Sequence, residues 1–143
     1  MIRFTYIFLL FFSFSVAQSD MESGIAAYNN RAEGSNGAIA KSQPINLAIR
    51  YFEKAAKIPE NELNANIYLL QSYYFKGKYV LEDENTKKEI FNKGKILAEK
   101  LIKKYPNSGA LRYWYLVNLG SWAEVYGIIS AAREGVADIM RTE

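Results

Sequence analysis

Apolar residues recur at intervals of three and four along most of the chain, the spacing that places side chains on one face of an α-helix. The alternation of apolar and polar residues that is typical of strands is missing. The pattern therefore predicts an all-α protein. We expect six helices, which start near the following residues: Ser19, Pro44, Asn61, Thr86, Ser108 and Ile128.

Turn-forming and capping residues set the expected limits of these helices. Thr86 and Glu89 have the spacing of a capping box, and Gly77 is expected to end the third helix. The segment 32–43 predicts a long loop, whereas the other connections are short. The last helix is expected at about 128–140, and the sequence shows no cap or breaker at its end. The sequence therefore leaves open whether the chain is part of a longer helical array. Pro is tolerated only near helix starts or past helix ends, as fits its three occurrences: Pro44, Pro59 and Pro106.

The first 17 residues have the parts of a secretory signal peptide. Arg3 precedes a run of about thirteen mostly apolar residues, and Ser15 and Ala17 fit the small positions before a cleavage site. A retained membrane anchor is the alternative, but a spanning helix needs about 20 apolar residues. We therefore expect cleavage after Ala17, a mature domain over residues 18–143, and a secreted or periplasmic protein with no stable membrane span after cleavage.

Two predicted helices share a spacing of small, aromatic and proline residues. In each, a small residue is followed by two further packing residues and a Pro: Ala48, Phe52, Ala55 and Pro59, then Gly94, Ala98, Leu101 and Pro106. The helix between them carries a matching first-helix pattern: Leu69, Tyr73, Gly77 and Tyr79. On these residues the chain resembles the tetratricopeptide repeat (TPR) family over residues 19–140. It departs from the family at the long loop 32–43, and Pro59 and Pro106 are further apart than the family's period of about 34 residues.

The resemblance implies an antiparallel helix-pair solenoid of about three pairs that binds a partner protein on its concave surface. First helices line this surface in the family. The third predicted helix presents one face that is turned away from its Leu63–Leu70 stripe. The resemblance therefore implies a contact surface for an envelope partner protein on four residues of that face: Asn64, Tyr68, Gln71 and Phe75.

The aromatic segment Arg112–Glu124, followed by Gly127, resembles a helix of exported repeat proteins in the T-component group of TRAP transporters. This second resemblance implies a small-solute-binding subunit of an envelope uptake system, as the alternative to the scaffold. The possible ligand pocket would then include four residues: Trp114, Asn118, Ser121 and Trp122. For Asn118, a core position satisfied by backbone groups is the competing interpretation.

Composition excludes several chemistries before any site is considered. The chain has 143 residues, no His and no Cys, so Ser-His-Asp triads, Cys-His pairs and zinc fingers are impossible. The loop at 34–37 lacks the Gly and Lys pattern of a nucleotide-binding loop. We find no carboxylate pair that would suit a hydrolase. We therefore expect a binding protein rather than an enzyme, with no cofactor and no metal.

Charge changes this picture little. The net charge of +3 is too small to predict nucleic-acid binding, and the lysines of 87–104 alternate with apolar residues as an exposed helix face does. The alternative to a merely solvated face is that these lysines bind anionic lipid. The acidic run 82–84 fits a solvated turn beside a helix N-terminus, although adjacent carboxylates could also bind a cation.

Overall fold

The computed structural model describes residues 20–143. The predicted signal peptide, its cleavage site and Ser19 lie outside the described residues. Within them the chain is all-helical, as predicted, apart from turns and one isolated β-bridge between Asn36 and Ile39. No helix in this part of the chain combines the length and hydropathy that a membrane crossing requires.

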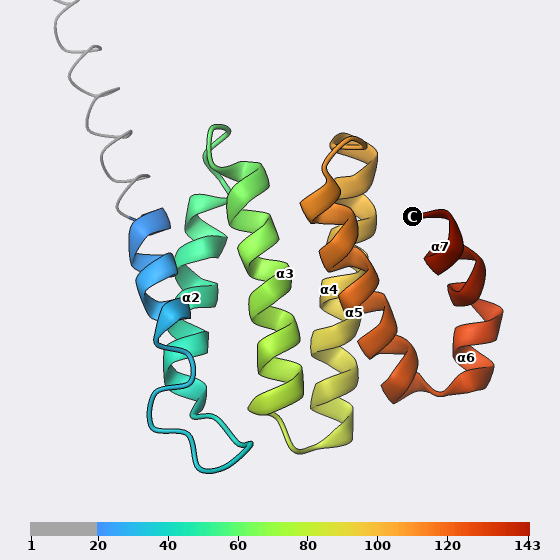
Figure 1. The fold of residues 1–143 in the computed structure, drawn as a ribbon. Helices are drawn as coiled ribbons and strands as arrows, with labels where there is room; N and C mark the ends of the chain where they lie inside the picture. The colour runs from blue at the N-terminus through green and yellow to red at the C-terminus, as the bar shows by residue number, and fades with distance from the viewer. Residues whose placement is uncertain (1–19) are drawn as a thin grey trace, which may run out of the picture.

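The described residues form a helical segment at 20–29, here called the 20–29 helix, and six further helices. Neighbouring helices stand side by side and alternate in direction (Figure 1). Their bounds are as follows: α2 Ser42–Ala55, α3 Glu62–Tyr79, α4 Glu84–Lys104, α5 Gly109–Tyr126, α6 Ile128–Arg133 and α7 Val136–Thr142.

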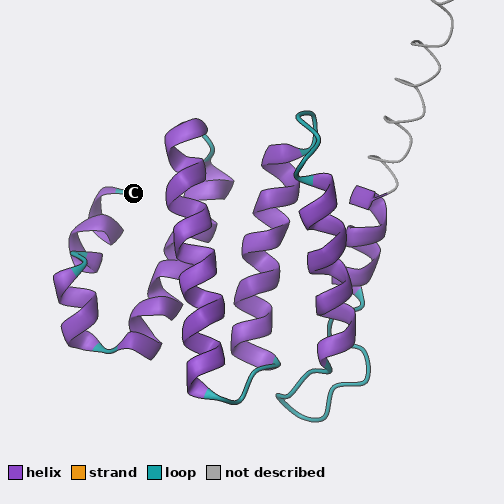
Figure 2. Ribbon diagram, turned by 180° about the vertical axis from the view of Figure 1, so that it is seen from behind, coloured by secondary structure: helices purple, strands orange, loops and turns teal. Residues whose placement is uncertain are grey.

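The helices are arranged in two rows. The 20–29 helix and α5 lie in front of α2 and α4 in Figure 1, and the view from behind in Figure 2 reverses this order. Helix α3 packs against α2 and α4 and also against α5, the next-but-one helix along the chain. We call the side formed by the 20–29 helix, α3 and α5 the first-helix face.

Two clusters of buried side chains hold the rows together. One joins the 20–29 helix, α2 and α3: Ala27, Ile45, Ala48, Ile49, Phe52, Leu69 and Tyr73. The other joins α3, α4, α5 and α7: Leu70, Phe91, Ala98, Leu101, Leu111, Tyr115, Leu119, Trp122 and Val136. Buried side chains of α2, α3 and α4 thus form much of the core.

Two glycines permit close approach between neighbouring helices, Gly77 between α3 and α4 and Gly24 between the 20–29 helix and α2. The prediction that Gly77 ends its helix is wrong, because α3 continues through this buried residue to Tyr79. A Cβ on Gly77 would lie 2.5 Å from Cζ of Phe91 on α4. Gly24 approaches Phe52 of α2 in the same way, with a Cβ distance of 2.6 Å. Gly77 therefore serves packing rather than helix termination.

Two helix starts show how capping selects a boundary. Helix α4 begins earlier than the predicted box at Thr86, because the Asp83 side chain is the N-cap and accepts a hydrogen bond of 2.9 Å from the Thr86 N–H. The predicted cap at Ser108 is confirmed, since its hydroxyl accepts a bond of 3.3 Å from the Leu111 N–H.

The single helix expected at 128–140 is divided into α6 and α7. Gly135 lies between them with φ of +66°, the left-handed conformation that interrupts a helix and that glycine adopts without strain. Ion pairs join this last segment to the rest, from Lys95 of α4 to Glu134 and from Arg112 of α5 to Glu143. Val136 is the buried residue that α7 contributes to the core.

Candidate functional site

A row of aromatic rings crosses the first-helix face from the 20–29 helix to α5. The rings form two groups, with centroids 5.8 Å apart for Tyr28 and Tyr68 in one, and 5.1 Å for Phe75 and Tyr79 and 6.1 Å for Tyr74 and Trp114 in the other. Further contacts join Tyr74 to Tyr79 and Trp114 to Tyr113. We call these seven residues the aromatic band: Tyr28, Tyr68, Tyr74, Phe75, Tyr79, Tyr113 and Trp114.

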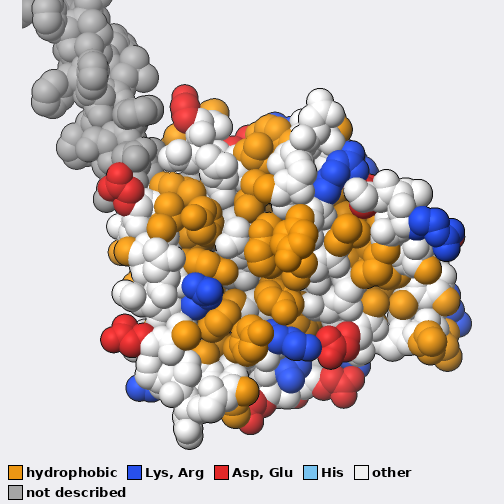
Figure 3. All heavy atoms as spheres, viewed as in Figure 1, with side chains coloured by type: hydrophobic (Ala, Val, Ile, Leu, Met, Phe, Trp, Pro, Cys, Tyr) orange, Lys and Arg blue, Asp and Glu red, His pale blue; other side chains and the backbone are white. Residues whose placement is uncertain are grey.

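The aromatic band is partly open to solvent. Tyr113 is 61% exposed and Tyr79 is 39% exposed, whereas the other five members are half-buried. Figure 3 views the molecule from this side and shows hydrophobic side chains across the middle of the face, with most acidic side chains toward its margin. Aromatic residues that combine apolar area with a polar tip are typical of protein-binding surfaces.

Arg31 connects the two parts of the band. Its guanidinium carbon lies 4.2 Å from the ring centroid of Tyr28 and 5.3 Å from that of Phe75. Its Nη1 donates to the Tyr28 carbonyl at 3.0 Å, while its Nε is buried without a hydrogen-bond partner. Arg31 forms no ion pair with any carboxylate of residues 20–143.

Two tyrosine hydroxyls of the band, those of Tyr28 and Tyr74, have raised pKa values. Burial raises the pKa of Tyr28, although the positive charge of Arg31 opposes this shift. Burial also raises the pKa of Tyr74, and the neighbouring Tyr79 adds to the effect. An ordinary tyrosine pKa is about 10, so both hydroxyls keep their protons well above pH 7.

The four predicted contact residues do not contribute equally to this face. Tyr68 stacks on Phe52 with centroids 4.8 Å apart, so part of its ring belongs to the core. Phe75 lies in the aromatic band beside Tyr79, Gln71 is half-buried, and Asn64 is exposed. Tyr68 and Phe75 are thus brought together with other aromatic residues, but Asn64 has no ring contact.

Sequence reasoning missed the extent of the band. Tyr74 packs against the core and also joins Tyr79 to Trp114 across two helices. The abundance of tyrosine was a signal, but it cannot distinguish packing from an open surface. Nothing in the sequence around Arg31 indicated that a guanidinium would lie between two rings.

The predicted ligand pocket on α5 is filled by its own side chains. Asn118 is 0% exposed and its Nδ2 donates to the carbonyls of Leu70 at 3.2 Å and Trp114 at 2.9 Å. Ser121 donates to the Val117 carbonyl at 2.9 Å. Asn118 is therefore a core residue held by backbone groups. Five surface hollows of the described residues are lined entirely by side chains other than Trp114, Asn118, Ser121 and Trp122.

Trp122 lies in a separate, more enclosed environment than Trp114. It stacks on Tyr126 with centroids 4.6 Å apart, and the Nζ of Lys95 lies 4.9 Å from its ring centroid. Burial would lower the pKa of Lys95, but hydrogen bonds to Glu134 and Glu99 outweigh it and raise the pKa. The charged group is therefore paired, as a buried ammonium must be. The Lys95–Glu134 pair joins α4 to the turn that follows α6.

One ion pair crosses the first-helix face at the margin of the band. Lys78 of α3 and Glu124 of α5 lie 3.1 Å apart. Both side chains are exposed, so water screens their attraction. The pair bridges the two helices that carry most of the aromatic band.

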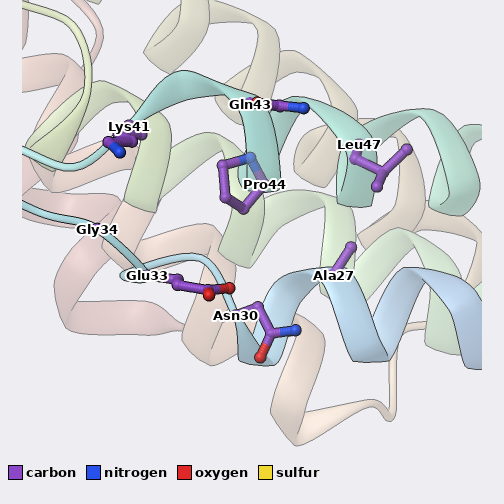
Figure 4. Close-up of a pocket in the computed structure, with 8 residues that line it drawn as sticks. All are labelled: Ala27, Asn30, Glu33, Gly34, Lys41, Gln43, Pro44 and Leu47. Carbon is purple, nitrogen blue, oxygen red and sulfur yellow. The ribbon is translucent and has the colours of Figure 1, made fainter.

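A hollow of about 430 Å³ lies between the end of the 20–29 helix, the following turn and the start of α2 (Figure 4). Its wall combines apolar side chains of Ala27, Pro44 and Leu47 with the polar groups of Glu33 and Lys41. The polar residues are exposed and belong to the turns. The hollow contains no member of the aromatic band, and we assign it no chemistry.

The acidic run 82–84 acts through helix capping, since Asp83 caps α4. In the part of the chain that the structure describes, no three carboxylates gather in a geometry that could hold a metal ion. Asp83 beside the helix N-terminus also complements the helix dipole.

Comparisons with known proteins identify no relative. No family model, no curated protein and no solved structure matches the chain. Function is therefore argued from the first-helix face itself.

Proposed function

We propose that this protein is an exported helical-repeat scaffold that docks an envelope protein on its first-helix face. The observation that carries the proposal is the aromatic band, which continues from the 20–29 helix through α3 to α5 and stays partly open to solvent. Aromatic side chains contribute strongly to binding because they bury a large area at little entropic cost.

Rigid support favours binding over flexible packing. The band is mounted on three helices, and each of them contributes buried side chains to one or both of the core clusters. Tyr68 is held by Phe52, and Asn118 fixes the backbone of α5 to that of α3. A partner would therefore meet a surface that is already ordered, which reduces the entropic cost of association.

The packing supports a TPR-like arrangement within this proposal. The small and aromatic residues of the repeat spacing are buried where successive helices meet, and the first helices contact one another as well as their partners. The following positions of that spacing are buried: Ala48, Phe52, Ala55, Gly94, Ala98 and Leu101. A solenoid of this kind binds by presenting one face of its helices.

The test compares capture of partners by variants of opposite faces. Immobilised protein is exposed to the envelope fraction of its native host, and the bound proteins are identified by native mass spectrometry. The double variant Tyr79→Ser with Tyr113→Ser removes the two most exposed rings of the band. We expect it to lose a discrete captured protein while its melting temperature stays close to that of the wild type.

The matched control is Ile96→Ser, which removes a side chain that is 55% exposed on α4. We expect this variant to retain the captured protein. The proposal fails if both variants capture the same proteins as the wild type, or if the control alone loses them. The predicted pair Tyr68 and Gln71 suits this test less well, because loss of Tyr68 would also disturb its stacking on Phe52.

A further inference from the structure

Arg31 is a cation within the aromatic band that the described residues leave without an anion. Its guanidinium lies over Tyr28 and near Phe75, which fixes the plane of the group. The cation at the other side of the face, Lys78, is already paired with Glu124. A guanidinium keeps its charge at every physiological pH, so Arg31 presents an uncompensated positive charge among rings.

The position of Arg31 also limits which of its hydrogen-bond donors are free. Nη1 is used by the Tyr28 carbonyl and Nε is enclosed without a partner. The Nη2 of Arg31 makes no hydrogen bond to the described residues and can donate a charge-assisted hydrogen bond to a carboxylate oxygen. Because the rings on both sides are apolar, groups adjacent to that carboxylate would contact aromatic surface.

Resting on the proposed function, we infer that the partner contributes a segment in which an Asp or Glu side chain is flanked by apolar residues, and that Arg31 receives its carboxylate. The aromatic band supplies the apolar contacts, and Arg31 selects the acidic residue between them. Arg31 is thus the specificity-determining residue of the first-helix face.

The test uses a library of short random peptides displayed with their C-termini fused, so that every carboxylate comes from a side chain. The wild type should enrich peptides that carry Asp or Glu between apolar residues. In a selected peptide, replacement of the acidic residue by its amide should weaken binding about tenfold, the value of one charge-assisted contact. This comparison uses the wild-type protein and does not depend on the folding of any variant.

Two protein variants locate the effect. In Arg31→Gln the acidic peptide and its amide form should bind equally, whereas Arg50→Gln, which removes the same charge from an exposed site on α2, should keep the tenfold preference. Enrichment of apolar peptides without acidic residues would overturn the role of Arg31 while leaving the proposed function intact. In a second library with free C-termini, selection of peptides that lack an acidic side chain would assign the anion to a chain end and overturn the inference. Failure to select any peptide would overturn the role of Arg31, whereas the capture experiment with Tyr79→Ser and Tyr113→Ser tests the proposed function separately.

Discussion

Helix α5 contributes to two aromatic regions that differ in what surrounds them. Around Trp122 and Asn118, side chains from α3, α4 and α5 close over one another, and Asn118 is completely buried. One turn away, Trp114 joins Tyr74 and the exposed Tyr113 on the first-helix face. The sequence pattern placed Trp114 and Trp122 in one pocket. Both rings pack against the same core cluster, but Trp122 is nearly buried and Trp114 is half-buried, so we expect different effects when each is removed.

The largest expected effect comes from emptying the enclosed region. Trp122→Ala removes a nearly buried ring and should lower the free energy of unfolding by about 3–5 kcal/mol, since the cavity cannot collapse fully. Urea unfolding measures this value. A loss below about 1 kcal/mol would mean that the region around Trp122 is not a closed core.

The contact between α4 and α5 gives the next largest effect. A Cβ on Gly94 would overlap the Asn118 side chain, with Cγ only 2.8 Å away. Gly94→Ala should therefore destabilise the protein by about 1–3 kcal/mol, although Ala favours a helix over Gly by about 1 kcal/mol.

A double-mutant cycle isolates this contact. Asn118→Ala removes the overlapping atoms but also loses its hydrogen bonds to Leu70 and Trp114. The variant carrying both changes should be more stable than the sum of the single effects predicts, by about 1 kcal/mol or more. Strict additivity in urea unfolding would show that Gly94 and Asn118 do not meet.

Loss of the half-buried ring of Trp114 should affect partner capture more than stability. Trp114→Ala removes a half-buried ring that contacts Tyr74 and Tyr113 and packs against the core, and should cost about 1–2 kcal/mol of stability, less than Trp122→Ala. Partner capture should nevertheless be lost. Comparison of its melting temperature and capture with those of Trp122→Ala tests the division of α5. A variant that is as unstable as Trp122→Ala would move Trp114 into the core.

The smallest effect is expected at the margin of the first-helix face. Lys78→Gln breaks the exposed pair with Glu124 and should change stability by less than about 1 kcal/mol. The small difference should shrink further in high salt because the pair is screened. A salt-independent loss in thermal unfolding would indicate that Lys78 has a packing role instead.

The all-helical class and most helix limits followed from the sequence because they depend on local signals. Ser108 could be predicted as a cap from its position before an apolar run, and Pro44 does lie in the first turn of α2. Local signals do not show which of Gly77 and Gly135 interrupts a helix. Both are glycines in a helical pattern, but Gly77 faces Phe91 within a helix whereas Gly135 adopts a positive φ and interrupts one.

The candidate site was less predictable because it depends on contacts between distant helices. Tyr68 and Phe75 were identified from the face that they share on one helix, and both lie in the aromatic band. Tyr28 and Tyr113 come from two other helices and Arg31 comes from the turn after the 20–29 helix, and a periodic pattern does not specify the relative positions of these segments. The partial burial of Tyr68 by Phe52 is likewise a tertiary contact.

Site-specific photo-crosslinking in the native host tests the central claim most directly. A photoreactive phenylalanine analogue is placed at Tyr113, at Tyr79 or, as the control, at Ile96 on α4, all of which are exposed. The account predicts that the two band positions cross-link to the same envelope protein and that position 96 does not. Cross-linking from position 96 alone, or none from either band position in a folded protein, would contradict the assignment of the first-helix face as the docking surface.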